Sequence, residues 1–183
     1  MSDAKHVLGV CDVSRFQRLG VKGPNAAQWL AEHGIALPQR PNAWVLQAPA
    51  TLVLRLGNTE FLLEDQGESG FCATLAAAQH TAPNGVFPVQ RYDLSVQLSG
   101  NKIPDLLSEL CTLDLREKTL AADTVVMTQV ADISATVLRQ TLNNETVYRL
   151  WCDGTYGVYM WETLVEIAQE HGGGVVDLHA LFN

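Results

Sequence analysis

The chain has 183 residues, of which 47% are hydrophobic and 17% charged, and its formal net charge is -8. This length allows a substantial core, and the low share of charged residues predicts a rather apolar surface of the kind that a partner covers. The negative charge and the lack of a Lys/Arg patch argue against nucleic acid as a partner, because phosphates require basic groups. No apolar run is long enough to span a bilayer, so we expect no membrane partner either.

A strand, a glycine turn and a short helix open the first half of the chain. Residues 1–6 are expected to form a frayed tail. Leu19–Val21 shows the alternation of a strand. Gly23 lets the backbone turn, and Pro24 is expected at the first helical position, where a missing N–H costs nothing. An apolar stripe at helical spacing follows, and Gly34 is placed to end the helix in a left-handed conformation.

The first half continues through a loop, a hairpin and a second helix. The two prolines of Pro38–Trp44 predict a stiff loop. Arg55–Leu63 has the pattern of two strands with Gly57-Asn58 as their turn. An alanine-rich helix is expected near 70–79, with Ser69 as its N-cap. Residues 81–88 form the densest turn cluster and the natural joint between two halves.

The second half repeats this order. Ser95–Leu115 again shows strand alternation, a glycine and an apolar helical stripe, and Gly100 lies 77 residues after Gly23. Val137–Trp151 reads as a hairpin around two asparagines. The last helix is expected over residues 156–171.

The two halves therefore predict an α+β fold of duplicated β-α-β-β-α units around antiparallel sheets. The pseudo-repeats run over about 9–82 and 89–172, within a single domain of residues 1–183. Unrelated segments can share so short a pattern by chance, and this alternative stays open.

The cysteines indicate a reducing compartment. They are widely separated, contain no CxxC pair and lie in apolar contexts, and no signal peptide is recognised, which together predict a cytoplasmic protein. A four-cysteine zinc site is the alternative, but structural zinc sites bring paired ligands at short spacing, so no metal is expected. The four are Cys11, Cys72, Cys111 and Cys152.

No catalytic motif is complete. His171–Gly174 reads HGGG, which occurs in the oxyanion hole of some esterases, but the chain has no GxSxG nucleophile elbow. We interpret Gly172 as a helix C-cap with His171 at the negative end of the helix dipole. No glycine-rich phosphate loop is present, so no flavin is expected on this chain. The five histidines never stand at metal-ligand spacing, and three of them follow predicted helices.

Acidic and aromatic residues supply the remaining candidates. Asp93 and Asp132 stand among strand-forming residues, and each is either a buried, pKa-shifted base or an exposed turn residue. A cluster of aromatic residues around the start of the last helix either lines a pocket for a flat ligand or belongs to the core or an interface. Its members are Trp151, Tyr156, Tyr159 and Trp161.

Several segments resemble the gamma subunit of heterotetrameric sarcosine oxidase, within the folate-binding aminomethyltransferase (glycine-cleavage T-protein) superfamily. They are DVSRFQRLGVKGPNAAQWL, LRLGNTEFLL and TYGVYMWETL, and their order and spacing agree from about Gly9 to Glu170. The resemblance implies a folate-binding aminomethyltransferase-like domain without the C-terminal barrel of full aminomethyltransferases.

The resemblance also implies candidate ligand residues. The family's GExGxE-like segment, whose first acid binds the pterin of folate, falls near Gly154–Gly157, and Thr155 stands in place of that Glu. Trp151, Thr155 and Tyr156 are therefore the candidate tetrahydrofolate pocket, and no catalytic residue is implied. The KGCYxGQ-type signature of folate-binding iron–sulfur-assembly paralogues is absent.

The function implied is that of an accessory gamma-type subunit, non-catalytic alone, whose partners are the large flavin-binding subunits of a sarcosine-oxidase-like complex. That complex would demethylate an N-methyl amino acid oxidatively and pass the one-carbon unit to tetrahydrofolate. The alternative is a stand-alone folate-binding protein or a tetrahydrofolate-dependent aminomethyltransferase. We expect the partner surface at Pro38–Trp44 and at the start of the last helix, with Trp44 either an interface anchor or a core residue.

Overall fold

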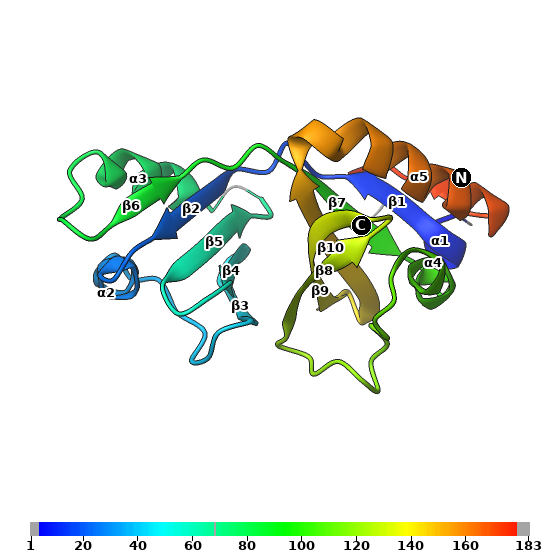
Figure 1. Ribbon diagram of the computed structural model, residues 1–183, viewed down its shortest axis with the longest axis horizontal. Coiled ribbons are helices and arrows are strands. Elements are labelled where there is room, and N and C mark those ends of the chain that lie inside the picture. Colours follow the sequence, from blue (N-terminus) through cyan, green and yellow to red (C-terminus); the bar gives the residue numbers. More distant parts are fainter. Residues whose placement is uncertain (1–3, 68, 179–183) are drawn as a thin grey trace. The chain divides into compact units, whose positions relative to one another are not determined.

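The computed structural model describes residues 4–67 and 69–178. The chain divides into two compact units: a smaller unit of residues 15–91, and a larger unit that combines residues up to 14 with those from 92 onward. Each unit contains one sheet and two helices of at least seven residues (Figure 1). This mixed α+β architecture with antiparallel-rich sheets confirms the predicted fold class.

The smaller unit is built on a five-stranded antiparallel sheet of order β3-β4-β5-β2-β6. The alternation of apolar residues that predicts its strands also places one side chain in two on the face that the helices cover. The strands are β2 (Arg18–Lys22), β3 (Ala43–Gln47), β4 (Thr51–Arg55), β5 (Glu60–Asp65) and β6 (Phe87–Val89).

Helices α2 (Ala26–Glu32) and α3 (Phe71–Gln79) cover one face of this sheet, and their apolar side chains share a core with it. Helix α2 ends at Gly34 in a left-handed conformation (φ 78°), as predicted. The N–H of Gly34 bonds the carbonyl of Ala31 and the next N–H bonds that of Leu30, which is the Schellman pattern.

The starts of both helices differ from the prediction. Pro24 lies in the turn before α2, one residue ahead of the N-cap Asn25, rather than at the first helical position. Gly70, not Ser69, is the N-cap of α3. The hydroxyl of Ser69 accepts only a long hydrogen bond (3.4 Å) from the backbone N–H of Phe71, the first residue of α3. The stronger cap comes from β5, because buried Asp65 accepts the N–H of Cys72 at 3.0 Å.

The larger unit is built on a six-stranded sheet of order β11-β1-β7-β10-β9-β8. Only the β1–β11 pair is parallel among its described strands. The strands are β1 (Gly9–Asp12), β7 (Asp93–Ser99), β8 (Val125–Val130), β9 (Ile133–Leu142), β10 (Glu145–Asp153) and β11 (Gly174–Val175).

Helices α4 (Ile103–Leu110) and α5 (Gly157–Glu170) cover one face of the larger unit's sheet, and Figure 1 shows α5 running along the strands there. A 3-10 turn, η1 (Gly154–Tyr156), leads into α5. A short helix, α1 (Ala4–Leu8), occupies part of the predicted frayed tail. Residues 1–3 lie outside the described residues. Leu8 at the end of α1 is fully buried in the core and anchors this segment to the larger unit.

Two hairpins in the larger unit use two-residue turns with positive φ. Asn143 and Asn144 (φ 51° and 65°) join β9 to β10, as predicted. Ala131 and Asp132 (φ 50° and 63°) join β8 to β9 in the same way. Asp132 is therefore an exposed turn residue, one of the two alternatives that the sequence left open.

The two sheets have corresponding strand orders. In each unit a strand leads through a glycine to a helix, and three further strands then precede a second helix. The sequence predicted only two strands between the two helices of each unit. β1 precedes β2 in the chain but pairs with β7. β6 lies partly inside the predicted joint of residues 81–88 but pairs with β2. The first strand of each sequence half thus belongs to the sheet of the other half.

Candidate functional site

A groove of about 380 Å³ lies beside α4 in the larger unit. One wall is the exposed side of α4, including Asp105 and Ser108, and the other is the loop that follows the helix, residues 111–116. Tyr148 of β10 also lines the groove. The lining mixes apolar side chains with charged ones.

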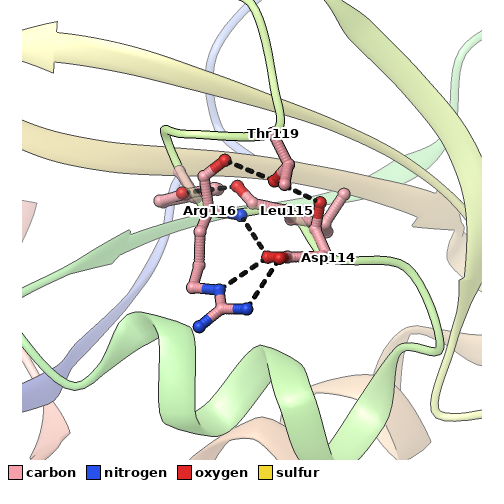
Figure 2. A network of polar contacts seen from close by, with 5 residues as sticks. Asp114, Leu115, Arg116 and Thr119 are labelled. Carbon is pink, nitrogen blue, oxygen red and sulfur yellow. Dashed lines mark hydrogen bonds and ion pairs between the residues drawn. The ribbon is translucent and has the colours of Figure 1, made fainter.

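The loop wall is organised by Asp114 and Arg116 (Figure 2). The carboxylate of Asp114 accepts Nε and Nη2 of Arg116, both at 2.7 Å, and the backbone N–H of Arg116 at 3.1 Å. These hydrogen bonds hold the pKa of Asp114 well below its usual range and raise that of Arg116. The hydroxyl of Thr119 donates to the carbonyls of Asp114 and Arg116. The guanidinium is therefore held in a defined orientation at the rim of the groove.

Tyr148 anchors the loop to the sheet. Its hydroxyl donates a 2.7 Å hydrogen bond to the carbonyl of Leu115, and both residues are buried. Burial raises the pKa of Tyr148, so the phenol stays protonated and donating across the neutral range.

Two smaller hollows continue this groove around the start of α4. One, of about 200 Å³, shares Arg116 and Tyr148 with it and extends to Asn101 and Thr146. The other, of about 280 Å³, extends from Asn101 and Thr146 to His6 and Glu145. Nδ1 of His6 lies 3.5 Å from the carboxylate of Glu145, both side chains being about half exposed.

The structure places Trp151, the first candidate of the folate pocket, on β10 with 1% of its surface exposed. The guanidinium carbon of Arg149, two residues earlier on the same strand, lies 5.1 Å from the centroid of the Trp151 ring. Nη2 of the Arg149 guanidinium donates a 2.9 Å hydrogen bond to the hydroxyl of Ser95. Trp151 thus contacts a cation on a buried face of the sheet.

Thr155 and Tyr156 lie in η1, beyond the end of β10. Both the N–H and the hydroxyl of Thr155 bond Oδ1 of Asp153, at 2.8 and 2.7 Å. These hydrogen bonds lower the pKa of Asp153. Tyr156 is 51% exposed. The side chain of Thr155 thus stabilises the turn, while Trp151 is buried and Tyr156 is exposed.

The other candidate base, Asp93, opens β7 at half burial and stands opposite Asp153 in the β7–β10 register. Cys152 adjoins this pair. Burial, followed by the two carboxylates, raises the pKa of Cys152 to about 11, so its thiol is protonated near neutral pH. This end of β10 therefore carries no reactive thiolate.

The cysteines are buried, and three histidines lie at the helix ends where the sequence placed them. All four cysteines are buried thiols. His33, His80 and His171 are the C-caps of α2, α3 and α5. Gly172 has φ 80° and completes a Schellman cap, while Nε2 of His171 lies 2.7 Å from Glu109 of α4. Within residues 4–67 and 69–178, no cluster of three or more potential ligands for a metal ion occurs, and no helix is long and apolar enough to cross a membrane.

Sequence reasoning missed the groove and its organising residues, Asp114 and Arg116. A local signal was present, because an Asp two residues before an Arg and five before a Thr suits a side-chain-capped turn. The partner that fixes this turn, Tyr148, lies more than thirty residues away and cannot be paired with it by a local pattern.

Comparison with known proteins supports the resemblance found in the sequence. No family model matches the chain. The sarcosine oxidase subunit gamma of Arthrobacter sp is 30% identical over 106 residues, which cover 58% of this chain and 52% of that relative. The match thus spans about half the length of the curated relative.

Two of the solved structures that share the fold belong to a sarcosine oxidase and to a glycine cleavage system. A chain of the heterotetrameric sarcosine oxidase from Corynebacterium sp. U-96, in complex with pyrrole 2-carboxylate, matches with a TM-score of 0.74 and 22% identity over 96% of this chain and 93% of that one. The glycine cleavage system aminomethyltransferase T from Bartonella henselae matches with a TM-score of 0.68 and 16% identity, over 98% of this chain and 50% of that protein. These matches confirm the predicted resemblance, and at such identities the solved structures establish the fold alone.

Proposed function

We propose that this chain is an accessory gamma-type subunit of a sarcosine-oxidase-like complex. The observation that carries the proposal is the agreement between a sequence match to a sarcosine oxidase subunit gamma and a fold match over nearly the full length of both chains. The complex would demethylate an N-methyl amino acid oxidatively and transfer the one-carbon unit to tetrahydrofolate. We place it in the cytoplasm, which the four buried thiols favour.

Exposed apolar side chains support a partner surface on the larger unit. Tyr156, Val158 and Tyr159 at the start of α5 are 51%, 73% and 52% exposed. Tyr92, 79% exposed, lies close by, because a Cβ on Gly154 of η1 would come within 2.1 Å of the carbonyl of Tyr92. Such a group of exposed aromatic and aliphatic side chains is typical of interface anchors.

Trp44 offers a second surface, on the smaller unit. It lies in the edge strand β3, not in the loop where the sequence placed it, and is half-buried. Val45 packs on the helix-covered core, so strand alternation directs Trp44 to the opposite face, together with Leu46, which is 50% exposed. Leu54, which is paired with Trp44 across the strands on that face, is fully buried, so the placement of Trp44 is compatible with both the interface role and the core role.

The partners in this proposal are the large flavin-binding subunits, and this chain itself carries no flavin. Co-expression with the large subunits of a sarcosine-oxidase-like complex from the same organism is the test. We expect the chain to co-purify with them in fixed proportion, and the isolated chain to be colourless and without amine oxidase activity. Failure to co-purify, or a flavin spectrum from the isolated chain, refutes the proposal.

Tetrahydrofolate would contact Trp151, Thr155 and Tyr156 in this proposal, but these residues do not fit a tight site. Trp151 is 1% exposed, and the hydroxyl of Thr155 already bonds Asp153. Replacing the family's Glu by Thr removes a charge-assisted hydrogen bond to the pterin, which costs on the order of 1.5–3 kcal/mol, or about tenfold to a hundredfold in affinity. Calorimetric titration should find weak binding, and a sub-micromolar dissociation constant contradicts this reasoning.

A second candidate function is a stand-alone folate-binding protein or aminomethyltransferase, which the fold match to aminomethyltransferase T favours. The two functions differ in one measurement. Tight folate binding or aminomethyl transfer by the isolated chain supports the second candidate, whereas stable association with large subunits supports the first.

We also propose that the fold is a single duplicated domain, with repeats over about 9–82 and 89–172. The corresponding strand orders of the two sheets support this proposal. So do Gly23 and Gly100, which have φ 125° and 102° and each stand three residues before a helix. Superposition of the two units in an experimental structure tests it, since these glycines must then coincide.

A further inference from the structure

The edge strand β8 presents backbone groups that point away from the sheet. Among the described strands, β8 pairs with β9 alone, in the register Val130 with Ile133 across a two-residue turn. In such a hairpin the pair beside the turn exchanges hydrogen bonds, and bonded and non-bonded pairs then alternate. The N–H and C=O groups of Val125, Met127 and Gln129 consequently face outward.

These outward groups have no assigned partner in the parts of the chain that the structure describes. No turn or loop hydrogen bond uses the backbone of Met127 or Gln129. Both side chains are also exposed, Met127 at 54%. The strand thus offers three N–H donors and three C=O acceptors at the spacing of another strand.

The sequence of β8 lacks the features that block strand pairing. Val125–Val130 contains no charged residue, no proline and no bulge. Two of the other described edges are protected, because β6 is three residues long and contains Pro88, and β11 is two residues long. The edge strand β3 is covered only at its end, where the side chain of Gln47 bonds the backbone of Gly34 and Ala36. Proteins usually protect exposed edges in these ways, so an unprotected six-residue edge indicates a pairing site.

We propose that β8 is the docking edge for an extended segment of a partner polypeptide, which adds to the sheet as a seventh strand. This inference rests on the proposed accessory-subunit function and specifies where the large subunits attach. The backbone ladder would supply affinity, and exposed side chains such as Met127 would supply selectivity.

Charge identifies the partner as a different chain rather than a second copy. Pairing of two β8 strands would bring together two chains that each have a net charge of -8, and each chain also carries the exposed Asp132 in the turn at one end of β8. Repulsion between these like charges opposes a second copy as the occupant. The fitting segment has an uncharged strand-forming centre flanked by Lys or Arg.

A matched pair of variants at one position tests the proposal. Gln129→Pro removes an outward N–H without removing a bond to β9, whereas Gln129→Ala removes only the side chain. We expect Gln129→Pro to weaken binding to the co-expressed large subunits about tenfold or more, and Gln129→Ala to leave it within about twofold. If Gln129→Pro does not fold, Gln129→Lys replaces it, with Ser134→Lys on the neighbouring strand as its control.

Each outcome decides the question. If the wild type binds the large subunits and Gln129→Pro binds equally well, the accessory function stands and the docking edge is wrong. If the wild type does not bind them, both proposals are wrong. Sedimentation of the chain alone completes the test: a wild-type dimer that Gln129→Pro dissociates makes the occupant a second copy and overturns the assignment to a different partner.

Discussion

Replacing Gly100 by alanine should destabilise the larger unit strongly. Gly100 joins β7 to α4 with φ 102°, a conformation that disfavours any residue with a Cβ. A Cβ at this position would also lie 2.5 Å from the carbonyl oxygen of Val7 and 2.9 Å from the nitrogen of Leu8. These are backbone atoms of α1, which runs directly into β1. They can move away from the added Cβ only if the start of the buried strand β1 also moves.

A matched control separates the cost of placing alanine at a positive φ from the cost of displacing packed backbone atoms. Gly34 has φ 78°, but a Cβ there meets nothing within 4 Å, so Gly34→Ala carries the conformational cost alone, about 1–2 kcal/mol. Gly100→Ala adds displacement of packed backbone, which costs about 1–3 kcal/mol in a dense interior. The total of about 2–5 kcal/mol corresponds to a fall in melting temperature of roughly 10 °C for a chain of this length.

Urea denaturation followed by circular dichroism measures both variants against the wild type. Gly23→Ala provides a parallel in the smaller unit, since its Cβ would lie 2.2 Å from the carbonyl oxygen of Gly85. We expect Gly23→Ala and Gly100→Ala to lose similar stability, each well beyond Gly34→Ala. Equal losses for Gly100→Ala and Gly34→Ala would refute the close backbone approach.

Three further predictions concern single side chains. Tyr148→Phe removes the buried hydrogen bond to Leu115 and should lower the free energy of unfolding by about 1–2 kcal/mol in urea titrations. The pKa of Asp114 is lowered by Arg116, so its stabilisation is present above the unfolded pKa and is lost as the pH falls. Asp114→Asn should therefore be less stable than wild type at pH 7, with a difference that narrows as the pH falls from 5 toward 2, and a pH-independent difference contradicts this. Trp44 is half-buried, so Trp44→Ala should lower the free energy of unfolding by less than the about 3–5 kcal/mol lost at a buried aromatic site, while weakening co-purification with the large subunits. A loss of about 3–5 kcal/mol in urea denaturation would contradict the interface role.

Local chemistry was sufficient to predict many elements of this fold. Asn143-Asn144 predicts a hairpin because asparagine tolerates positive φ, and Gly34 and Gly172 predict helix ends for the related reason that glycine has no Cβ. The amphipathic spacing in Ile103–Leu110 predicts a helix on a core, which the structure confirms. Each of these signals lies within a few residues of the feature that it predicts.

The candidate site was less predictable, because its groups come together through distant pairing. The loop at Asp114 and Arg116 is organised by local bonds, but it becomes a groove wall only where Tyr148 holds it against β10. Trp151 reads as a ligand-stacking residue in the sequence, yet the strand places it on a buried face beside Arg149. Alternation predicts that neighbours on a strand face opposite ways and does not say which face stays open.

Local patterns were enough to predict the main helices and the two segments of strand, glycine and helix, because these depend on propensity and on conformations that only particular residues adopt. They did not predict the third strand that each unit has before its second helix. The tertiary structure alone decided how the strands are shared. β1 pairs with β7 and β6 with β2, so that each sheet takes its closing strand from the other half of the sequence. Sheet hydrogen bonds join backbone groups that every residue possesses, and the choice between distant strands is made by the packing of whole faces, which no short segment encodes.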